Sequence, residues 1–251
     1  MDRQERAVNL PGRNADSPTS AASQEARCVA LTQSRRGHGQ STLIWYLARA
    51  LAAEGLRVLV MDMTGRRDQL RTLAASVAGP PSNLGVWTPA LSRGPLSALV
   101  RIARQRTRGK VDVILLDTDV AALESAGGFA APIDYVLVLI DPTETGQKTA
   151  DALAERLGDA APPMGQVGVA FSRMNASDAA TVPQQTEDRH LPVLGYFPAD
   201  YLLAGDESGQ RRDKPPAIPH DDYLQAVQRL SRTLTKLARL RPVPPSSSAA
   251  S

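Results

Sequence analysis

Short apolar runs alternate with segments of helical periodicity along most of the chain. The runs Val29–Leu31 and Val58–Met61 have the length of buried strands, and between them apolar residues recur every three or four positions from 43 to 51. Gly55 stands just after this periodic segment, where glycine commonly ends a helix. The order strand, loop, helix, strand predicts one βαβ unit, and hence parallel strands, at residues 28–62.

The same alternation continues toward the C-terminus. We expect further strands at Leu84–Thr88, Val111–Thr118, Ile133–Ile140, Val167–Phe171 and Leu191–Phe197. We expect helices at Leu96–Gln105 and Thr143–Leu157, and within Thr64–Ala78 a helix that follows a basic turn at 65–67. We also expect a helix or loop at Ala121–Ala131, and a final helix whose apolar stripe contains Leu224, Val227, Leu230, Leu234 and Leu237. Alternating strands and helices predict a doubly wound α/β fold with a mainly parallel sheet and helices on both faces.

The loop after the first strand carries two glycines, Gly37 and Gly39, and Ser41 and Thr42 follow at the start of the helix. Such a loop lets backbone N–H groups converge on an anion at a helix N-terminus, where the helix dipole favours negative charge. In a standard phosphate loop, a lysine precedes the Ser/Thr and reaches the terminal phosphates. Here Gln40 stands in that position, and a neutral amide binds phosphate more weakly than an ammonium does. The loop is therefore either a nucleotide site that has lost much of its catalytic power or an ordinary turn without a ligand.

Two aspartates stand at the ends of apolar strands. Asp62 ends the strand that follows the loop helix, and Asp117 ends the strand Val111–Thr118. A carboxylate in this place is typical of a Walker B motif, whose aspartate holds magnesium beside the phosphate loop. In open α/β sheets, ligands bind at the carboxyl ends of the strands. We therefore expect Ser41, Asp62 and Asp117 to cluster at one edge of the sheet.

These motifs resemble those of the ParA/MinD ATPases, over roughly Arg27 to Leu240. The sequence R-R-G-H-G-Q-S-T resembles the deviant Walker A motif K-G-G-x-G-K-S/T-T, with Arg35 on the family's signature lysine and Gln40 on its catalytic lysine. The sequence D-M-T at 62–64 resembles the Asp-x-Asp motif, with threonine in the second place. The signature lysine of this family reaches across a dimer to the partner's nucleotide, so the resemblance implies a dimer formed across the loop.

Three later segments carry the resemblance further. V-I-L-L-D-T, which contains Asp117, resembles the family's Walker B motif. V-G-V-A-F-S-R-M is similar to the strand that usually ends in an adenine-reading asparagine, and Ser172 stands there instead. L-G-Y-F-P-A-D, which contains Pro198, resembles the next strand and the loop around the base.

The resemblance implies a P-loop NTPase-like fold that binds ATP or ADP with Mg²⁺ weakly or not at all, with little or no hydrolysis. It assigns Mg²⁺ to Ser41 and Asp117, and the positioning of water to Asp62 if any hydrolysis occurs. It places the nucleotide against the following residues: Arg35, Gly37, His38, Gly39, Gln40, Ser41, Thr42, Ser172 and Pro198. The implied function is a nucleotide switch that positions or partitions DNA or a cellular assembly, as a homodimer or as a heterodimer with an active homologue.

A sister group, the bacterial tyrosine kinases of polysaccharide export, is also similar. Its motif S-x-x-P-G-E-G-K-S-T has the spacing of T-Q-S-R-R-G-H-G-Q-S-T, and Arg66 matches an arginine that follows its second motif. The C-terminal tyrosine cluster of that group is absent here, since the last tyrosine is Tyr223. Two alternatives therefore stay open: an accessory, pseudokinase-like protein of polysaccharide synthesis or export, and a scaffold that binds no nucleotide and pairs with an active homologue.

The charge pattern indicates two candidate contact surfaces. The net charge of +3 is too small to imply nucleic-acid binding by itself. Between Asp68 and Asp112 there is no acidic residue, but there are Arg71, Arg93, Arg101, Arg104, Arg106, Arg108 and Lys110. The final helix carries Arg229, Arg232, Lys236 and Arg239 at helical spacing. The first run is either a patch for an acidic partner or a solvated helix face, and the second is either a non-specific DNA contact or a solvated face.

The remaining features set the expected organisation and location. We expect a disordered leader at 1–26, one P-loop domain at 27–241, and a disordered tail rich in proline and serine at 242–251. The lone Cys28 is expected to be a core thiol in a reducing compartment. The longest apolar runs have only strand length, and the first residues lack an apolar core of the signal-peptide kind. We therefore expect a cytoplasmic protein that reaches the nucleoid or the inner membrane only through a partner, without direct membrane insertion.

Overall fold

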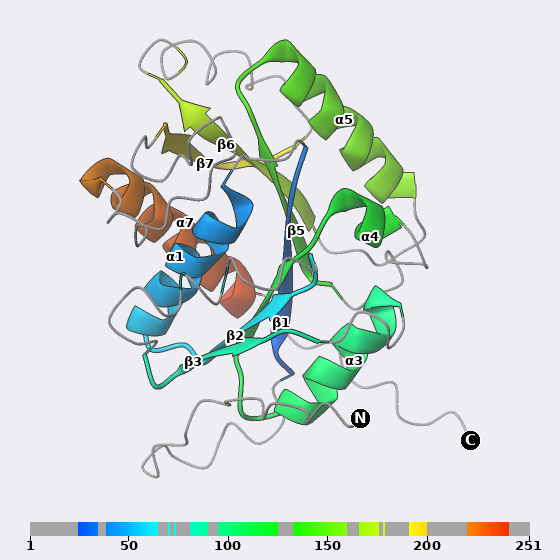
Figure 1. Cartoon of the computed structure of the whole chain (residues 1–251), viewed down its shortest axis with the longest axis vertical. Helices are drawn as coiled ribbons and strands as arrows, with labels where there is room; N and C mark the ends of the chain where they lie inside the picture. The colour runs from blue at the N-terminus through cyan, green and yellow to red at the C-terminus, as the bar shows by residue number, and fades with distance from the viewer. Residues whose placement is uncertain are drawn as a thin grey trace, which may run out of the picture.

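The computed structural model describes residues 25–34, 39–64, 70, 73, 81–89, 95–124, 133–159, 166–175, 178, 191–199 and 220–240 (Figure 1). The expected leader and tail fall almost entirely outside these ranges, so the three-part division of the chain stays a prediction. The described part is built from strands that alternate with helices along the chain.

One parallel sheet forms the centre of the molecule. Its seven strands are β1 (Arg27–Gln33), β2 (Val58–Asp62), β3 (Leu84–Trp87), β4 (Val113–Asp117), β5 (Tyr135–Ile140), β6 (Gln166–Met174) and β7 (Val193–Pro198). They are ordered β3-β2-β4-β1-β5-β6-β7, and each neighbouring pair is parallel. Every residue of β2, β4 and β5 is buried, as expected for strands covered on both faces. The predicted parallel α/β sheet is confirmed.

Helices cover both faces of the sheet (Figure 1). They are α1 (Gln40–Ala53), α3 (Leu96–Thr107), α4 (Val120–Glu124), α5 (Glu144–Asp159) and α7 (Asp221–Leu240). The helices α1 and α7 pack on one face in a common apolar cluster, and α3, α4 and α5 pack on the other. Of the helix predicted within Thr64–Ala78, only Leu70 and Leu73 are described beyond Thr64, and both are buried in the α1 cluster.

Glycines define the two ends of α1. Gly39 is its N-cap and has φ +79°, a conformation that residues with a side chain rarely adopt. Gly55 has φ +87° and follows the C-cap, as predicted. Its N–H donates to Ala52 O at 3.0 Å and the N–H of Leu56 donates to Leu51 O at 3.1 Å, which is the Schellman pattern of a helix end. The helix therefore begins at the carboxyl edge of the sheet and returns the chain to the amino edge.

The connections after β1 and β4 leave the sheet toward opposite faces. From β1 the chain passes to α1 on one face, and from β4 it passes to α4 on the other. Neighbouring strands whose connections leave in opposite directions form the switch point at which α/β sheets bind ligands. The fold thus places the candidate site at the carboxyl ends of these two strands.

Candidate functional site

The side chain of Gln40 turns inward at the first residue of α1. It is 4% exposed, and its Nε2 lies 2.8 Å from Leu31 O, 2.8 Å from Thr118 O and 2.5 Å from Oδ1 of Asp117. The acceptors come from the ends of β1 and β4, so this one amide ties the two strand ends together. An amide nitrogen carries only two N–H groups, whereas an ammonium carries three. The three acceptors around Nε2 therefore form an environment that would satisfy a lysine ammonium at least as well.

Asp117 also binds the hydroxyl that follows Gln40. Ser41 Oγ donates to Oδ2 of Asp117 across 2.7 Å, and both side chains are buried. Asp117 lies opposite Asp62 in the β2–β4 pairing, and both carboxylates face α1. The structure therefore brings Ser41, Asp62 and Asp117 to one edge of the sheet, in the arrangement expected from the sequence. One oxygen of Asp62 accepts hydrogen bonds from the backbone N–H (3.0 Å) and the hydroxyl (2.8 Å) of Thr64.

Four polar atoms that the sequence did not single out lie at the same edge. They belong to side chains at the ends of β1 and β4, are buried, and have no hydrogen-bond partner among the described residues: Thr32 Oγ1, Gln33 Oε1, Ser34 Oγ and Thr118 Oγ1. Buried polar groups in native proteins are nearly always satisfied by protein, water or a ligand, so a cluster of exceptions marks a place for one. The signal in the sequence was the change from apolar to polar residues directly after Leu31 and after Leu116.

The other predicted nucleotide contacts are more dispersed. Thr42 is half-buried in the first turn of α1. Ser172 is buried at the end of β6, where its hydroxyl donates to Ile140 O at 3.3 Å, and Pro198 ends β7. The strand order puts these two residues two and three strands away from β1. Arg35, Gly37 and His38 lie outside the described residues.

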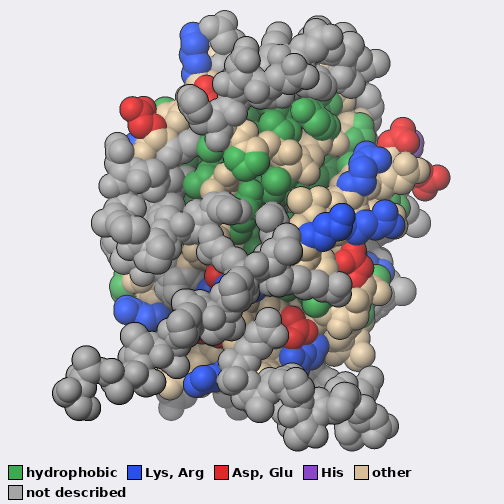
Figure 2. All heavy atoms as spheres, turned by 180° about the vertical axis from the view of Figure 1, so that it is seen from behind, with side chains coloured by type: hydrophobic (Ala, Val, Ile, Leu, Met, Phe, Trp, Pro, Cys, Tyr) green, Lys and Arg blue, Asp and Glu red, His purple; other side chains and the backbone are tan. Residues whose placement is uncertain are grey.

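The basic residues of α7 are exposed, in line with a surface role. Arg229, Arg232 and Lys236 project from its outer side, and the side chain of Arg239 lies outside the described part. Figure 2 shows Lys and Arg side chains on the side of the molecule that carries this helix. Serine and threonine on the inner side of α7 fix its position, because Ser231 and Thr235 donate to the carboxylate of Glu54 at the end of α1.

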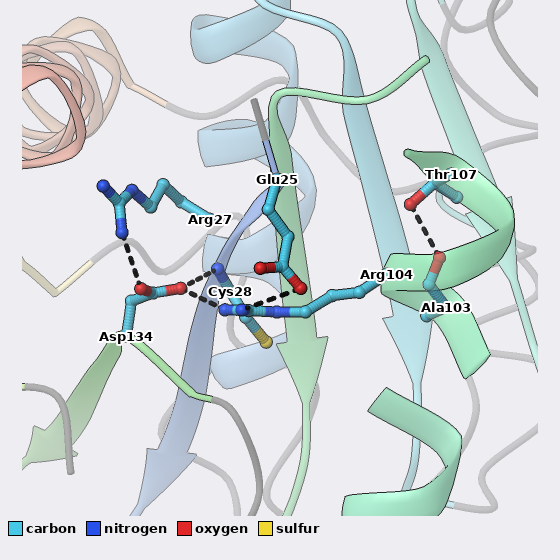
Figure 3. Close-up of polar contacts among 7 residues, drawn as sticks. All are labelled: Glu25, Arg27, Cys28, Ala103, Arg104, Thr107 and Asp134. Atoms are coloured by element: carbon cyan, nitrogen blue, oxygen red, sulfur yellow. Dashed lines mark hydrogen bonds and ion pairs between the residues drawn. The ribbon is translucent and has the colours of Figure 1, made fainter. Parts of the chain in front are cut away.

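One member of the basic run around α3 is not on the surface. Arg101, Arg106, Arg108 and Lys110 are exposed, and Arg71 and Arg93 lie outside the described residues, but the Arg104 side chain is 11% exposed. Figure 3 shows that its guanidinium points to Asp134, which also accepts from Arg27 and from the backbone N–H of Cys28. The expectation that Arg104 belongs to a solvated or partner-facing surface was therefore wrong. The ion pair between Arg104 and Asp134 links α3 to the amino ends of β1 and β5.

The amino edge of the sheet carries a second ion pair, away from the candidate site. Arg57 binds both oxygens of Asp112, at 2.6 and 3.0 Å, and the backbone carbonyl of Gly109 at 2.7 Å. Burial acts to raise the pKa of Asp112, but the hydrogen bonds and charge of Arg57 outweigh it and hold that pKa below its usual range. Burial raises the pKa of the Cys28 thiol to about 12, in keeping with the predicted core thiol.

No group of three or more His, Cys, Asp or Glu side chains suited to a metal ion occurs within the described ranges. Among the described helices, none combines the length and the apolar character that crossing a bilayer requires. The hydroxyl of Ser41 and the carboxylate of Asp117, which are hydrogen-bonded to each other, are oxygen groups of the kind that a hard cation favours.

Comparison with known proteins gives matches among solved structures. No protein-family model and no curated protein sequence matches the chain. It is similar to a chain of the MinC:MinD cell division protein complex of Aquifex aeolicus, with 18% identity over 87% of this chain and 98% of that one, at TM-score 0.62. It is similar to the septum site-determining protein MinD of Pyrococcus horikoshii, complexed with Mg-ADP, with 16% identity over 85% and 97% of the two chains, at TM-score 0.62.

A partition protein is similar as well. The putative plasmid partition protein of Borrelia burgdorferi, bound to AMPPNP, has 14% identity over 85% of this chain and 100% of that one, at TM-score 0.61. The chain therefore has the fold of the MinD and ParA-family ATPases, and the resemblance expected from its motifs is confirmed at the level of the fold.

Proposed function

We propose that the chain, which shares the fold of the MinD and ParA-family ATPases, is a nucleotide switch that binds Mg-nucleotide weakly and hydrolyses ATP slowly or not at all. The observation that carries this proposal is the cluster of Gln40, Ser41 and Asp117. It contains a hydroxyl and a carboxylate suited to magnesium, but a neutral amide stands where a cation would face the terminal phosphates. The switch would position or partition DNA or a cellular assembly as a dimer.

The residues at the carboxyl edge fit a magnesium nucleotide. Ser41 Oγ and Asp117 Oδ2 lie 2.7 Å apart, close enough to serve as ligands of one ion, and Mg²⁺ favours carboxylate and hydroxyl oxygens together with phosphate. Gly39 opens α1 with its N-terminus at this edge, and backbone N–H groups there would hold phosphate oxygens. The unpartnered hydroxyls of Thr32, Ser34 and Thr118 offer further donors. When bound, the metal would neutralise part of the phosphate charge.

The same residues argue against fast hydrolysis. Charge on the transferred phosphoryl group is normally stabilised by lysine or arginine, whose contribution to the rate amounts to orders of magnitude. The Gln40 side chain carries no charge and is committed to Leu31, Asp117 and Thr118. Asp62, the residue expected to position water, already has one oxygen engaged by Thr64.

Phosphate release measures this part of the proposal directly. The wild type should release phosphate slowly or not at all, with and without DNA, and Gln40→Lys should raise the rate if charge is what is missing. Gln105→Lys adds the same charge on the exposed side of α3 and should change nothing. Wild-type turnover equal to that of lysine-bearing relatives would refute the proposal.

One observation favours a second candidate, a scaffold of this fold that binds no nucleotide. Gln40 and Ser41 are both satisfied by Asp117, so the cluster is complete without a ligand. The two candidates differ in their response to Mg-ADP, because a ligand that binds only the folded state raises the melting temperature. A melting temperature that does not change at millimolar Mg-ADP would favour the scaffold.

The outer side of α7 is the proposed DNA contact. Arg229, Arg232 and Lys236 are exposed along one helix, and no described carboxylate pairs with them. Exposed cations at helical spacing can follow a phosphate backbone without reading its sequence. The chain would therefore hold DNA through α7, while nucleotide occupies the carboxyl edge and the loop contacts a second protomer.

A further inference from the structure

The outward side of α3 and the turn after it form a basic surface that the proposed function does not use. We call it the basic face of α3, and it consists of Arg101, Ile102, Arg106, Arg108 and Lys110, all exposed. Ile102 is the large apolar side chain that stands exposed among the described residues, at 38%. The rest of the helix is anchored, because Leu96, Leu99, Val100 and Ala103 are buried against the sheet.

The carboxylates near this surface are already committed to other arginines. Asp112 is held by Arg57, and Asp134 by Arg27 and Arg104, while Glu25 lies 3.4 Å from Arg104 (Figure 3). Each of these pairs lies beneath α3 or beside it, at the amino edge of the sheet. The four cations of the basic face have no carboxylate partner in the described part of the chain.

The helix α3 itself contains no acidic residue that could pair with these cations. No acidic residue occurs between Asp68 and Asp112, so no carboxylate stands three or four positions from Arg101, Arg106 or Lys110. Asp112 stands four positions after Arg108, but α3 ends at Thr107 and the Asp112 carboxylate is bound by Arg57. Like charges on neighbouring turns destabilise a helix slightly, and an exposed isoleucine gains nothing from water. The cations of the basic face therefore lack a carboxylate partner within the described part of the fold. In contrast, Arg57 binds Asp112 and Arg104 binds Asp134.

Position separates this surface from the candidate nucleotide site. The chain enters α3 after β3, at the carboxyl edge, and leaves it before β4, so Arg106, Arg108 and Lys110 lie toward the amino edge. Arg57 and Asp112, which precede β2 and β4, bind each other at that edge, and Arg57 also donates to the backbone carbonyl of Gly109. A partner on the basic face would therefore lie away from the candidate site at the carboxyl ends of β1 and β4.

We propose that the basic face of α3 binds an acidic segment of a partner protein, whose carboxylates pair with the arginines and whose apolar side chain covers Ile102. Three of the four cations are arginine, which is enriched at protein interfaces where lysine is depleted, and arginine binds carboxylates with two parallel hydrogen bonds. An exposed isoleucine among them has no counterpart on a phosphate backbone. A single apolar side chain is also far less than a membrane-bound helix inserts.

The test begins with selection of ligands from a random peptide library on the immobilised full-length chain. Selected peptides are synthesised with a fluorophore, and their affinity is measured by anisotropy against the wild type and four variants. Arg106→Glu/Arg108→Glu should weaken binding by more than about tenfold, and Arg106→Gln/Arg108→Gln should weaken it less. Ile102→Ser should weaken it severalfold without a change of charge. Lys148→Glu/Arg156→Glu changes the same charge on the exposed side of α5 and should have no effect.

The proposal predicts selected sequences in which Asp or Glu flank an apolar residue. It is overturned if no such pattern is selected, if the α5 variant weakens binding as much as the α3 variant, or if Ile102→Ser has no effect. A random-sequence DNA duplex and phosphatidylglycerol vesicles serve as competing probes. The proposal is wrong if the DNA or the vesicles bind the wild type, bind Arg106→Glu/Arg108→Glu more weakly, and do not displace the peptide. In that case the basic face of α3 is a binding surface for nucleic acid or membrane. Circular dichroism confirms that each variant is folded.

Discussion

Gln40 donates its side-chain amide to the carboxylate of Asp117, with 2.5 Å between Nε2 and Oδ1. The other oxygen of the same carboxylate accepts the hydroxyl of Ser41 at 2.7 Å. A single aspartate at the end of β4 thus holds the first two residues of α1. A cation that used Ser41 and Asp117 would have to replace the hydrogen bond between them, and this competition is one physical reason to expect weak nucleotide binding.

Ser41→Ala tests the magnesium assignment. We expect this variant to weaken ADP binding by roughly tenfold in magnesium, since a ligand oxygen is removed, and to change it much less in EDTA. Isothermal titration in the two buffers measures both values. Ser97→Ala removes a buried hydroxyl from α3 and serves as the control. Equal weakening in magnesium and EDTA would show that the hydroxyl acts on the fold or the phosphates and not on a metal.

Replacing Arg229, Arg232 and Lys236 together by alanine tests the DNA contact of α7. The triple variant should bind duplex DNA more weakly, and the slope of log affinity against log salt should flatten by roughly 0.9 for each phosphate that these side chains neutralise in the wild type. Fluorescence anisotropy over a series of salt concentrations gives the slope. As a control, replacing Arg101, Arg106 and Arg108 together by alanine removes the same charge from the region of α3. An unchanged slope in the α7 variant, or an equal weakening in the control, would leave the α7 side chains as a solvated face.

Cys28 makes stability depend on pH above the ordinary range of a thiol. Burial raises the pKa of this thiol to about 12 in the folded chain, so in alkaline solution the unfolded chain ionises first. Its contribution is complete below the unfolded pKa of about 8.5 and is lost as pH rises, by about 1.4 kcal/mol per pH unit. Between about pH 8.5 and pH 10 the wild type should therefore lose about 2 kcal/mol relative to Cys28→Ala. Urea unfolding at each pH measures the difference, and parallel curves for the two proteins would contradict the prediction.

Much of this architecture follows from local sequence. Each strand is an apolar run, and Gly39 and Gly55 mark the limits of α1, so periodicity and turn chemistry suffice to order the elements. The proximity of Asp62 and Asp117 also follows, because parallel strands end at one edge. The inward direction of the Gln40 side chain does not follow from local sequence, because its hydrogen-bond acceptors lie at the ends of two strands. One of these acceptors, Asp117, is 77 residues away in the sequence.

The burial of Arg104, at the amino edge of the sheet, also could not be predicted from local sequence. Arg104 stands among arginines of similar spacing, and only its fold-dependent approach to Asp134, 30 residues later, separates it from its exposed neighbours. The unpartnered hydroxyls of Thr32 and Thr118 likewise become visible only when two strands are paired. Side-chain direction and pairing between distant segments are therefore the properties that the sequence leaves undetermined.

We propose that the β1–α1 edge binds Mg-nucleotide and that the absence of a charged donor weakens this binding. One hydrogen bond to a charged group contributes about 1.5–3 kcal/mol, so its absence corresponds to a roughly ten- to hundredfold loss of affinity. Gln40→Lys restores an ammonium at the first residue of α1, beside the helix N-terminus where phosphate would bind, and it should tighten binding by that factor.

Calorimetric titration of the wild type and of Gln40→Lys with ATP and ADP in magnesium is the most direct test. We expect weak binding to the wild type, with heat at millimolar nucleotide, and binding roughly ten- to hundredfold tighter in Gln40→Lys. Gln105→Lys, which adds charge at a distance, should match the wild type. If neither the wild type nor Gln40→Lys gives heat at millimolar concentration, the edge is structural only and the claim of a nucleotide site is wrong.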